Sequence, residues 1–196
     1  FRHACLGQTG TVHLAPFIKC LQSLQILELC GNYIGSKGIA PLIKMLEAQW
    51  DLKYLGLAWN GLGDESCGHL AKIVRGRSRL QHVDLRHNRI GDVGSKRLSK
   101  AIKGHPSLEQ LDLQDNAVAI AGAESLFAAC GKRLELNMQN NPVPPEKIAQ
   151  LGASLKEARE KLHLTAFGGG PPGSAKGTLR PPRSREGGGG GGRSPA

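Results

Sequence analysis

A short pattern returns along this chain at a constant interval, and no other feature of the sequence limits its fold so strongly. The pattern is Leu-x-x-Leu-x-Leu-x-x-Asn, and its first copy spans residues 24–32. Further copies each begin 28 residues after the one before, at 52–60, 80–88 and 108–116. A shortened fifth copy ends at Asn141 and has Arg133 at the first apolar position. Because equivalent residues return in register, we expect every unit to fold alike and to bury its apolar edge against its neighbours.

The first half of each unit has the spacing of a β-strand followed by a turn. Leu27 and Leu29 are two residues apart, so on a strand they share a face, which we expect to point inward, while Glu28 points outward. The asparagine follows where the chain leaves the sheet, and its short amide can bond the backbone of the turn and of neighbouring turns. The predicted ladder consists of Asn32, Asn60, Asn88, Asn116 and Asn141.

The second half of each unit has the spacing of a helix. In the first full unit Gly35 and Gly38 are followed by Leu42 and Leu46, four residues apart on one helical face. An oxygen-bearing side chain, favourable near a helix start, recurs in one column at Ser36, Asp64 and Asp92. In the first helix Pro16 falls at an interior position, where we expect it to break or shorten the helix.

The composition divides the chain into three segments. Repeats occupy residues 1–141, a capping helix is predicted over 142–167, and residues 168–196 are rich in Gly, Pro and Arg and are expected to be disordered. Phe1 falls in the column of Leu29, so the chain begins inside a repeat, and we expect it to be the C-terminal part of a longer protein.

Membrane, metal and redox patterns are each weak in this sequence. No apolar run approaches the length of a membrane span, although 39% of the residues are hydrophobic. The five cysteines show neither C-x-x-C nor zinc-site spacing, so no metal or other cofactor is predicted. An odd, scattered set of cysteines favours a reducing compartment, and we predict the cytoplasm, with the nucleus as the alternative.

The chain is strongly basic, with a formal net charge of +10. Many cations fall on two neighbouring return helices and are expected to form a stripe on the outer side: Lys72, Arg75, Arg77, Arg79, Lys96, Arg97, Lys100 and Lys103. One interpretation is a solvated helix face. The other is contact with phosphate or with an acidic protein, in which the Arg- and Gly-rich tail adds affinity for nucleic acid.

Strand, asparagine turn, paired glycines and helix at this period resemble the ribonuclease-inhibitor-type leucine-rich repeats. That class includes ribonuclease inhibitor, the sensor ends of NOD-like receptors and the Ran GTPase-activating protein, and the resemblance extends to about residue 164. It implies an α/β solenoid bent into a horseshoe, with parallel strands on the concave side and helices on the convex side. Members mostly bind proteins through the concave face and the adjacent loops.

Reading the outward-facing columns of the strands and turns gives candidate partner-binding residues. Aromatic, histidine and arginine side chains, the usual composition of an interaction hot spot, gather at Tyr54, Trp59, His82, Arg86 and His87. An acidic group adjoins them at Asp84, Asp112 and Asp115. We predict that a protein partner docks here. The alternative for Trp59 is that its ring folds down over the adjacent turn.

The same residues give little support for catalysis. His82 and Asp84 share a strand face, but no serine or cysteine nucleophile is paired with them and no phosphate-binding glycine loop is present. The predicted function is therefore a non-enzymatic protein-interaction module within a larger scaffold, receptor or regulator. A nucleic-acid-associated protein is the first alternative, and a GTPase-activating regulator, by fold analogy alone, is the second.

Overall fold

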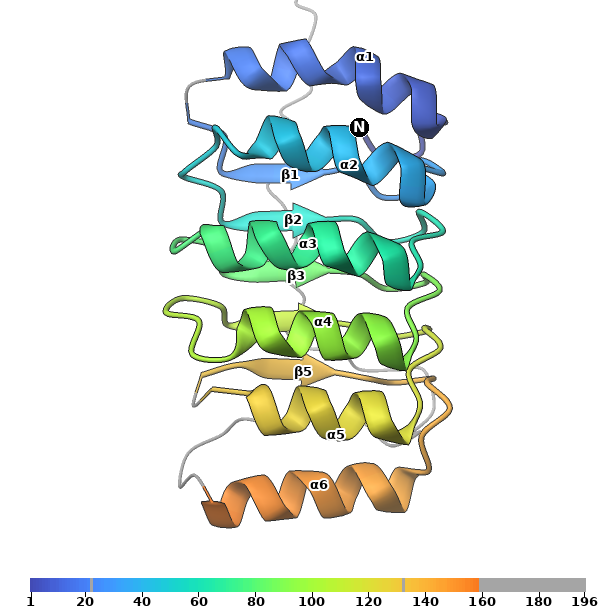
Figure 1. The fold of residues 1–196 in the computed structure, drawn as a ribbon, viewed down its shortest axis with the longest axis vertical. Helices are drawn as coiled ribbons and strands as arrows, with labels where there is room; N and C mark the ends of the chain where they lie inside the picture. The colour runs from blue at the N-terminus through green and yellow to red at the C-terminus, as the bar shows by residue number, and fades with distance from the viewer. Residues whose placement is uncertain (22, 132, 159–196) are drawn as a thin grey trace, which may run out of the picture.

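The computed structural model describes residues 1–21, 23–131 and 133–158, and in these residues strands and helices alternate along the whole chain (Figure 1). In chain order the elements are α1 (Gly7–Cys20), β1 (Ile26–Glu28), α2 (Gly35–Leu46), β2 (Tyr54–Gly56), α3 (Asp64–Gly76), β3 (His82–Asp84), α4 (Asp92–Ile102), β4 (Gln110–Asp112), α5 (Ile120–Ala129), β5 (Glu135–Asn137) and α6 (Pro145–Ala158). The end of the predicted capping helix and the tail of 168–196 lie outside the described residues.

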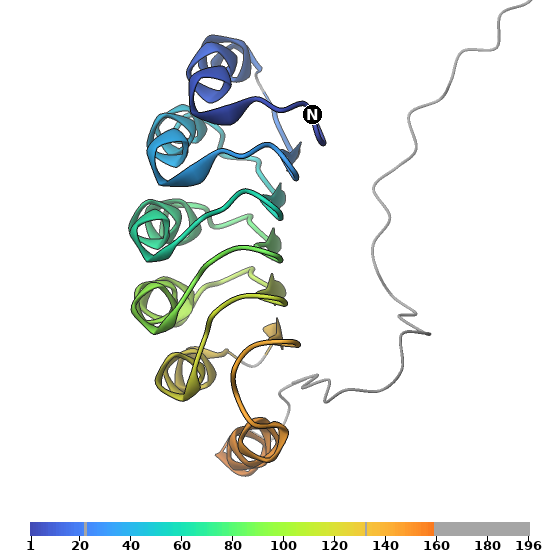
Figure 2. The ribbon, with the colours of Figure 1, turned by 90° about the vertical axis from the view of Figure 1, so that its right-hand side faces the viewer.

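The strands form one parallel five-stranded sheet in the order β1-β2-β3-β4-β5. The register aligns one apolar residue from each strand in a single buried row: Leu27, Leu55, Val83, Leu111 and Leu136. Figure 2 shows the strands as an inner layer and the helices as a bowed outer layer, with the core between them. The α/β leucine-rich-repeat solenoid expected from the sequence is confirmed.

Asparagine side chains join the turns of successive repeats. The Asn60 amide donates to the carbonyl oxygens of Leu29, at 2.8 Å, and Leu57, at 3.0 Å. Its Oδ1 accepts from the backbone N–H groups of Asn32, at 3.1 Å, and Ile34, at 3.3 Å. Equivalent contacts recur at Asn32, Asn88, Asn116 and Asn141. Each side chain therefore bonds backbone groups of both its own turn and a neighbouring one, which a stacked coil would otherwise bury unpaired.

Aspartates at the helix starts make a second set of inter-repeat bonds. Asp64 Oδ1 accepts from the backbone N–H groups of Gly91, at 2.7 Å, and Gly94, at 2.9 Å. Asp92 makes the same two contacts with the start of α5. These carboxylates therefore cap the helix of the following repeat, where the first N–H groups have no partner within their own helix.

The same contacts explain why Gly94 and Gly122 occur three residues after Gly91 and Ala119, the residues that precede α4 and α5. A Cβ atom at Gly94 would lie 2.6 Å from Asp64 Oδ1, and one at Gly122 would lie 2.5 Å from Asp92 Oδ1. In α3 the equivalent position holds Ser66, and the preceding repeat has Ser36 in place of the capping aspartate. The glycine thus makes room for the capping carboxylate of the previous repeat.

A third set of side chains bonds carbonyl groups near the C-terminal ends of the helices. One residue per repeat, in a column with a 28-residue period, reaches back to the preceding helix: Gln49, Arg77 and His105. Arg77 donates to the Leu46 carbonyl at 2.6 Å, and its guanidinium lies 4.7 Å from the centre of the Trp50 ring. Arg77 is only 4% exposed, and burial lowers its pKa. It is therefore a buried capping residue, and its inclusion in the exposed basic stripe was wrong.

The predicted interruption of the first helix at Pro16 does not occur. Helix α1 runs without a break through the proline, and α2 likewise contains Pro41. Pro16 lies on the exposed side of α1, as does Val12, whose carbonyl loses its helical partner. The unpaired carbonyl is thus on the side facing water, which reduces the penalty that an interior proline brings.

The shortened fifth repeat fills its first apolar slot with a different residue from the one that simple spacing indicates. Arg133 is exposed, whereas Leu134 is 3% exposed and belongs to the core. The register of β5 pairs Leu136 with Leu111, so the repeat rejoins the buried row within one strand. After it, α6 packs Ile148 and Leu151 against the core.

The contact between Asp64 and Gly94 gives a double-mutant test. Gly94→Ala should lower the free energy of unfolding by about 2 kcal/mol, because the new Cβ would lie 2.6 Å from the capping carboxylate and 2.8 Å from Cys67 Sγ. Adding Asp64→Ser should make the combined loss smaller than the sum of the single losses by about 0.5 kcal/mol or more. Gly68→Ala is the control, because nothing lies within 4 Å of a Cβ there, and it should gain about 0.5–1 kcal/mol. Additive losses in urea unfolding would contradict the assignment.

Candidate partner-binding surface

The first group of candidate residues lies on the inner strands, or in the case of Arg86 just after one, and is called here the strand group: Tyr54, His82, Asp84, Arg86 and Asp112. Tyr54 and His82 begin β2 and β3 and are register partners, with their ring centres 6.4 Å apart. Gly56 allows the tyrosine ring to lie along the strand, because a Cβ there would be 3.0 Å from Tyr54 Cε1. Burial, together with the charge of Asp84, raises the pKa of Tyr54 to about 12.

Arg86 is held by carboxylates of the chain itself. Its Nε and Nη2 donate to the two oxygens of Asp84 at 2.9 and 2.8 Å, and Asp112 Oδ2 lies 3.6 Å from its Nε. The hydrogen bond to Asp84 raises the pKa of Arg86. Burial raises the pKa of Asp112 even though Arg86 acts in the opposite direction.

The second group lies at the turns that follow the strands and is called here the rim group: Trp59, His87 and Asp115. The rings of Trp59 and His87 stack at 3.8 Å between centres, with an interplanar angle of 20°. His87 Nε2 lies 3.3 Å from Asp115 Oδ2, and Asn140 donates to Asp115 Oδ1 at 2.9 Å. Each of these residues has a left-handed backbone, with φ between 52° and 58°. One column of turn residues thus forms a continuous line across four repeats.

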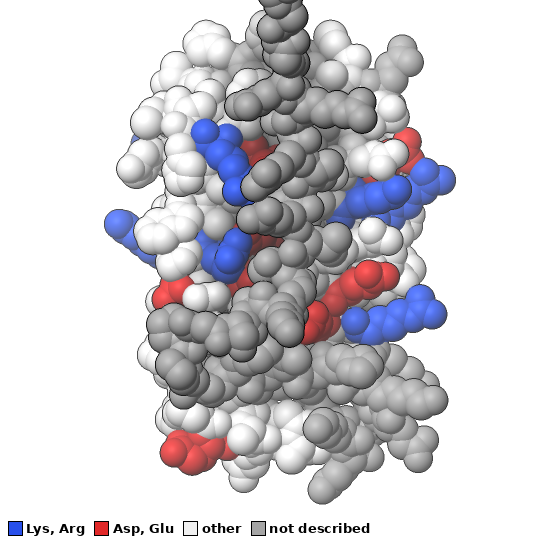
Figure 3. Space-filling model, turned by 180° about the vertical axis from the view of Figure 1, so that it is seen from behind, with Lys and Arg blue, Asp and Glu red and all other residues white. Residues whose placement is uncertain are grey.

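The structure therefore divides the predicted cluster into two adjoining groups. Trp59 does lie against the next turn, as the alternative interpretation proposed, yet 56% of the side chain remains exposed. Sequence reasoning left Asn140 out of the candidate residues, although Asn140 belongs to the same turn column as Trp59, His87 and Asp115. It also missed the ion pair of Arg2 with Glu28, at 2.6 Å. In Figure 3, which views the strand side, Asp and Glu side chains lie against Arg and Lys side chains.

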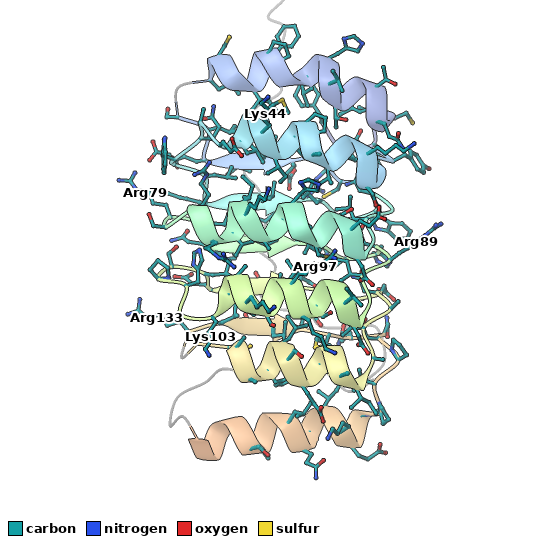
Figure 4. All side chains as sticks on the ribbon, viewed as in Figure 1. Lys44, Arg79, Arg89, Arg97, Lys103 and Arg133 are labelled. Atoms are coloured by element: carbon teal, nitrogen blue, oxygen red, sulfur yellow. The ribbon has the colours of Figure 1, made fainter. Side chains whose placement is uncertain are left out.

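On the outer side, the remaining cations of the predicted stripe differ in their contacts. Arg79 is paired with Asp51, and Arg97 donates to the Asp64 carbonyl at 2.6 Å. Figure 4 shows Arg79, Lys103 and Arg133 at one edge of the stack and Arg89 at the other. Several exposed cations have no acidic partner among the described residues: Lys72, Arg75, Lys96, Lys100 and Lys103.

Other kinds of site find little support in the part of the chain that the structure describes. It contains no cluster of ligands suited to a metal ion and no helix able to cross a membrane. None of the five cysteines, all of which lie in the described residues, forms a disulfide, and burial raises the pKa of Cys67 to about 12. A cavity of about 280 Å³ lies at the junction of the fourth and fifth repeats, lined by Ile102, Gly104, His105, Pro106, Leu108, Gly131, Arg133 and Leu134. Neither the strand group nor the rim group contributes to it.

Comparison with known proteins agrees with this architecture. A family model described as Leucine Rich repeat matches residues 79–99 and 104–127. The chain is similar in structure to leiomodin-1 actin-binding site 2, with a TM-score of 0.50 and 12% sequence identity over 81% of this chain and 77% of that one. No curated protein sequence matches the chain significantly. Together with the stacked repeats, these matches define the chain as a leucine-rich-repeat protein.

Titration of Tyr54 tests the geometry of the strand group. In a Tyr33→Phe variant, phenolate absorbance from Tyr54 should appear with a midpoint near pH 12, and in denaturant it should return towards the ordinary value of 10. The folded state holds the phenolic proton more tightly than the unfolded state. Stability should therefore fall as the pH rises from 10 towards 12. A midpoint at the ordinary value in the folded protein would show that the ring is not packed on the sheet.

Proposed function

We propose that this chain is a protein-interaction module whose partner docks on the strand group and the rim group together. The two groups adjoin at Arg86 and His87, which are consecutive residues. They place aromatic and imidazole side chains beside the ion-paired Arg86 on one face, and aromatic side chains are enriched in interaction hot spots. The acidic and basic side chains of this face pair with one another, and these contacts do not indicate a catalytic reaction.

The observation that carries the proposal is the state of Trp59. Its ring is stacked on His87, whose Nε2 lies 3.3 Å from Asp115 Oδ2, so the indole is held in place. More than half of the side chain is nevertheless accessible. An apolar ring that is already fixed loses little conformational entropy on binding, and it can contribute most of its buried area to affinity.

The structural likeness supports binding only in a general way. The similar solved structure is described as leiomodin-1 actin-binding site 2, so in that protein a chain of similar fold is an actin-binding site. At 12% identity the likeness concerns the fold, so the partner must be sought from the residues of this chain.

Replacing the two tryptophans separately tests the proposal. Peptides that bind the immobilised full chain are selected from a random display library, and their affinities are measured by fluorescence anisotropy. Trp59→Ala should weaken the selected peptides by about tenfold or more, because it removes the fixed aromatic anchor. Trp50→Ala is the matched control, since Trp50 is 68% exposed but contacts Arg77 at the other edge, and it should leave affinity unchanged. Equal affinity for a correctly folded Trp59→Ala variant would refute the proposal.

A second candidate function follows from the outer helices. Exposed Lys72 and Arg75 on α3 lie beside exposed Lys96 and Lys100 on the neighbouring helix α4, and the acidic residues of these helices lie at their first turns. Unpaired cations on adjacent helices favour contact with a polyanion such as a nucleic-acid backbone. In this candidate function the basic tail of 168–196 adds affinity.

Salt dependence separates the two functions. Binding of single-stranded RNA through these cations should fall steeply with salt, and deletion of 168–196 or the change Lys96→Ala with Lys100→Ala should reduce both affinity and the salt slope. Trp59→Ala serves as the control and should have no effect on RNA binding. RNA affinity that does not change with salt would contradict this second function.

A further inference from the structure

We infer that the segment docking on the strand and rim groups is basic, presenting lysine or arginine side chains beside apolar ones. This inference rests on the proposed function and names the chemical class of its partner. It follows from which charges on the concave face are already satisfied within the chain and which are not.

Two guanidinium groups of this face, those of Arg86 and Arg2, are bound to carboxylates of the chain itself. Arg86 makes a two-point contact with Asp84 and approaches Asp112. Arg2 makes an equivalent two-point contact with Glu28, at 2.8 and 2.6 Å. A guanidinium group that already donates to a carboxylate through two nitrogens offers little to a phosphate or to an acidic peptide, because that ligand would first have to displace the internal partner.

The carboxylates are not fully compensated in return. Asp112 shares Arg86 with Asp84, which has the closer contact, so two carboxylates depend on one guanidinium. Asp115 is paired with an imidazole and an amide instead of a permanent cation. Burial raises the pKa of Asp112, although Arg86 and the backbone N–H of Gln114, which donates to Asp112 Oδ1 at 3.0 Å, act in the opposite direction. An incoming ammonium or guanidinium group would give Asp112 and Asp115 an additional positively charged partner.

The aromatic residues are placed to receive the rest of such a side chain. Trp59 belongs to the same line of turn residues as Asp115, with His87 between them. Tyr54 lies on the strand beside Asp84, whose charge contributes to the raised pKa of the phenol. A lysine or arginine stem can pack on an aromatic face while its charged end is attracted both by the ring and by the nearby carboxylate.

The overall charge of the protein makes this inference testable. The whole chain has a formal net charge of +10, so non-specific attraction favours anions and opposes cations. A cationic peptide that binds must therefore find a local negative surface. An anionic peptide is expected to bind weakly on the outer helices, and replacing Lys96 and Lys100 by alanine would detect that separate contact.

The experiment compares three labelled peptides that share one leucine and tyrosine framework and carry lysine, glutamate or glutamine at the same positions. By anisotropy against the full chain, the lysine peptide should bind more tightly than the glutamine peptide, and the glutamate peptide should not bind this face. Asp112→Asn and Asp115→Asn should each weaken the lysine peptide by about two- to fivefold, less so at high salt. Glu65→Gln is the matched control, because Glu65 is an exposed acid at the start of α3, and it should have no effect.

A further variant distinguishes the internal role of Arg86 from direct recognition. Arg86→Gln, checked for folding by circular dichroism, should keep or strengthen lysine-peptide binding, because it leaves Asp112 without its cation. Loss of binding in that variant, or equal binding of the glutamine and lysine peptides, would overturn the inference. If a glutamate peptide binds and Trp59→Ala abolishes that binding, the docking surface stands and only its preference for a basic partner fails. If the display-selected peptides ignore Trp59, the docking surface itself fails.

Discussion

The structure depends on satisfying backbone groups that stacking places out of reach of water. A coil of short strands and turns buries N–H and carbonyl groups at every junction between repeats, and each would cost about 1–3 kcal/mol if left unpaired. In this chain three columns of side chains bond those groups across the junctions. Asparagines serve the turns after the strands, aspartates the helix starts, and Gln49, Arg77 and His105 the helix ends.

The same contacts also position the proposed binding surface. Because the columns keep the repeats in register, residues that are 28 apart in sequence become neighbours, as Tyr54 and His82 are on the sheet and Trp59 and His87 are at the rim. Residues scattered along the chain thereby form one continuous face. Its charges pair across the same junctions, so the contacts that position the face also decide which of its groups remain available to a partner.

The limits of sequence reasoning are seen at particular residues. The period and the strand pattern predicted the buried row from Leu27 to Leu111, because identical slots must stack alike. They did not show that Asp64 caps the next helix instead of its own, since that depends on the offset between adjacent coils. Arg77 resembles its exposed neighbours in sequence, but in the structure it donates to the Leu46 carbonyl at the end of α2 and is buried.

By itself the sequence determined the stack of repeats and which columns face inward, because periodicity is a local property that repeats without reference to the rest of the fold. The parallel sheet was implied by the resemblance to ribonuclease-inhibitor-type repeats. Only the tertiary structure decided how the charged and aromatic side chains of the inner face pair with one another. That pairing depends on distances of a few ångströms between different repeats, such as the approach of Arg86 to Asp84 and Asp112. Such distances are fixed by stacking geometry, which a pattern of residue types does not contain.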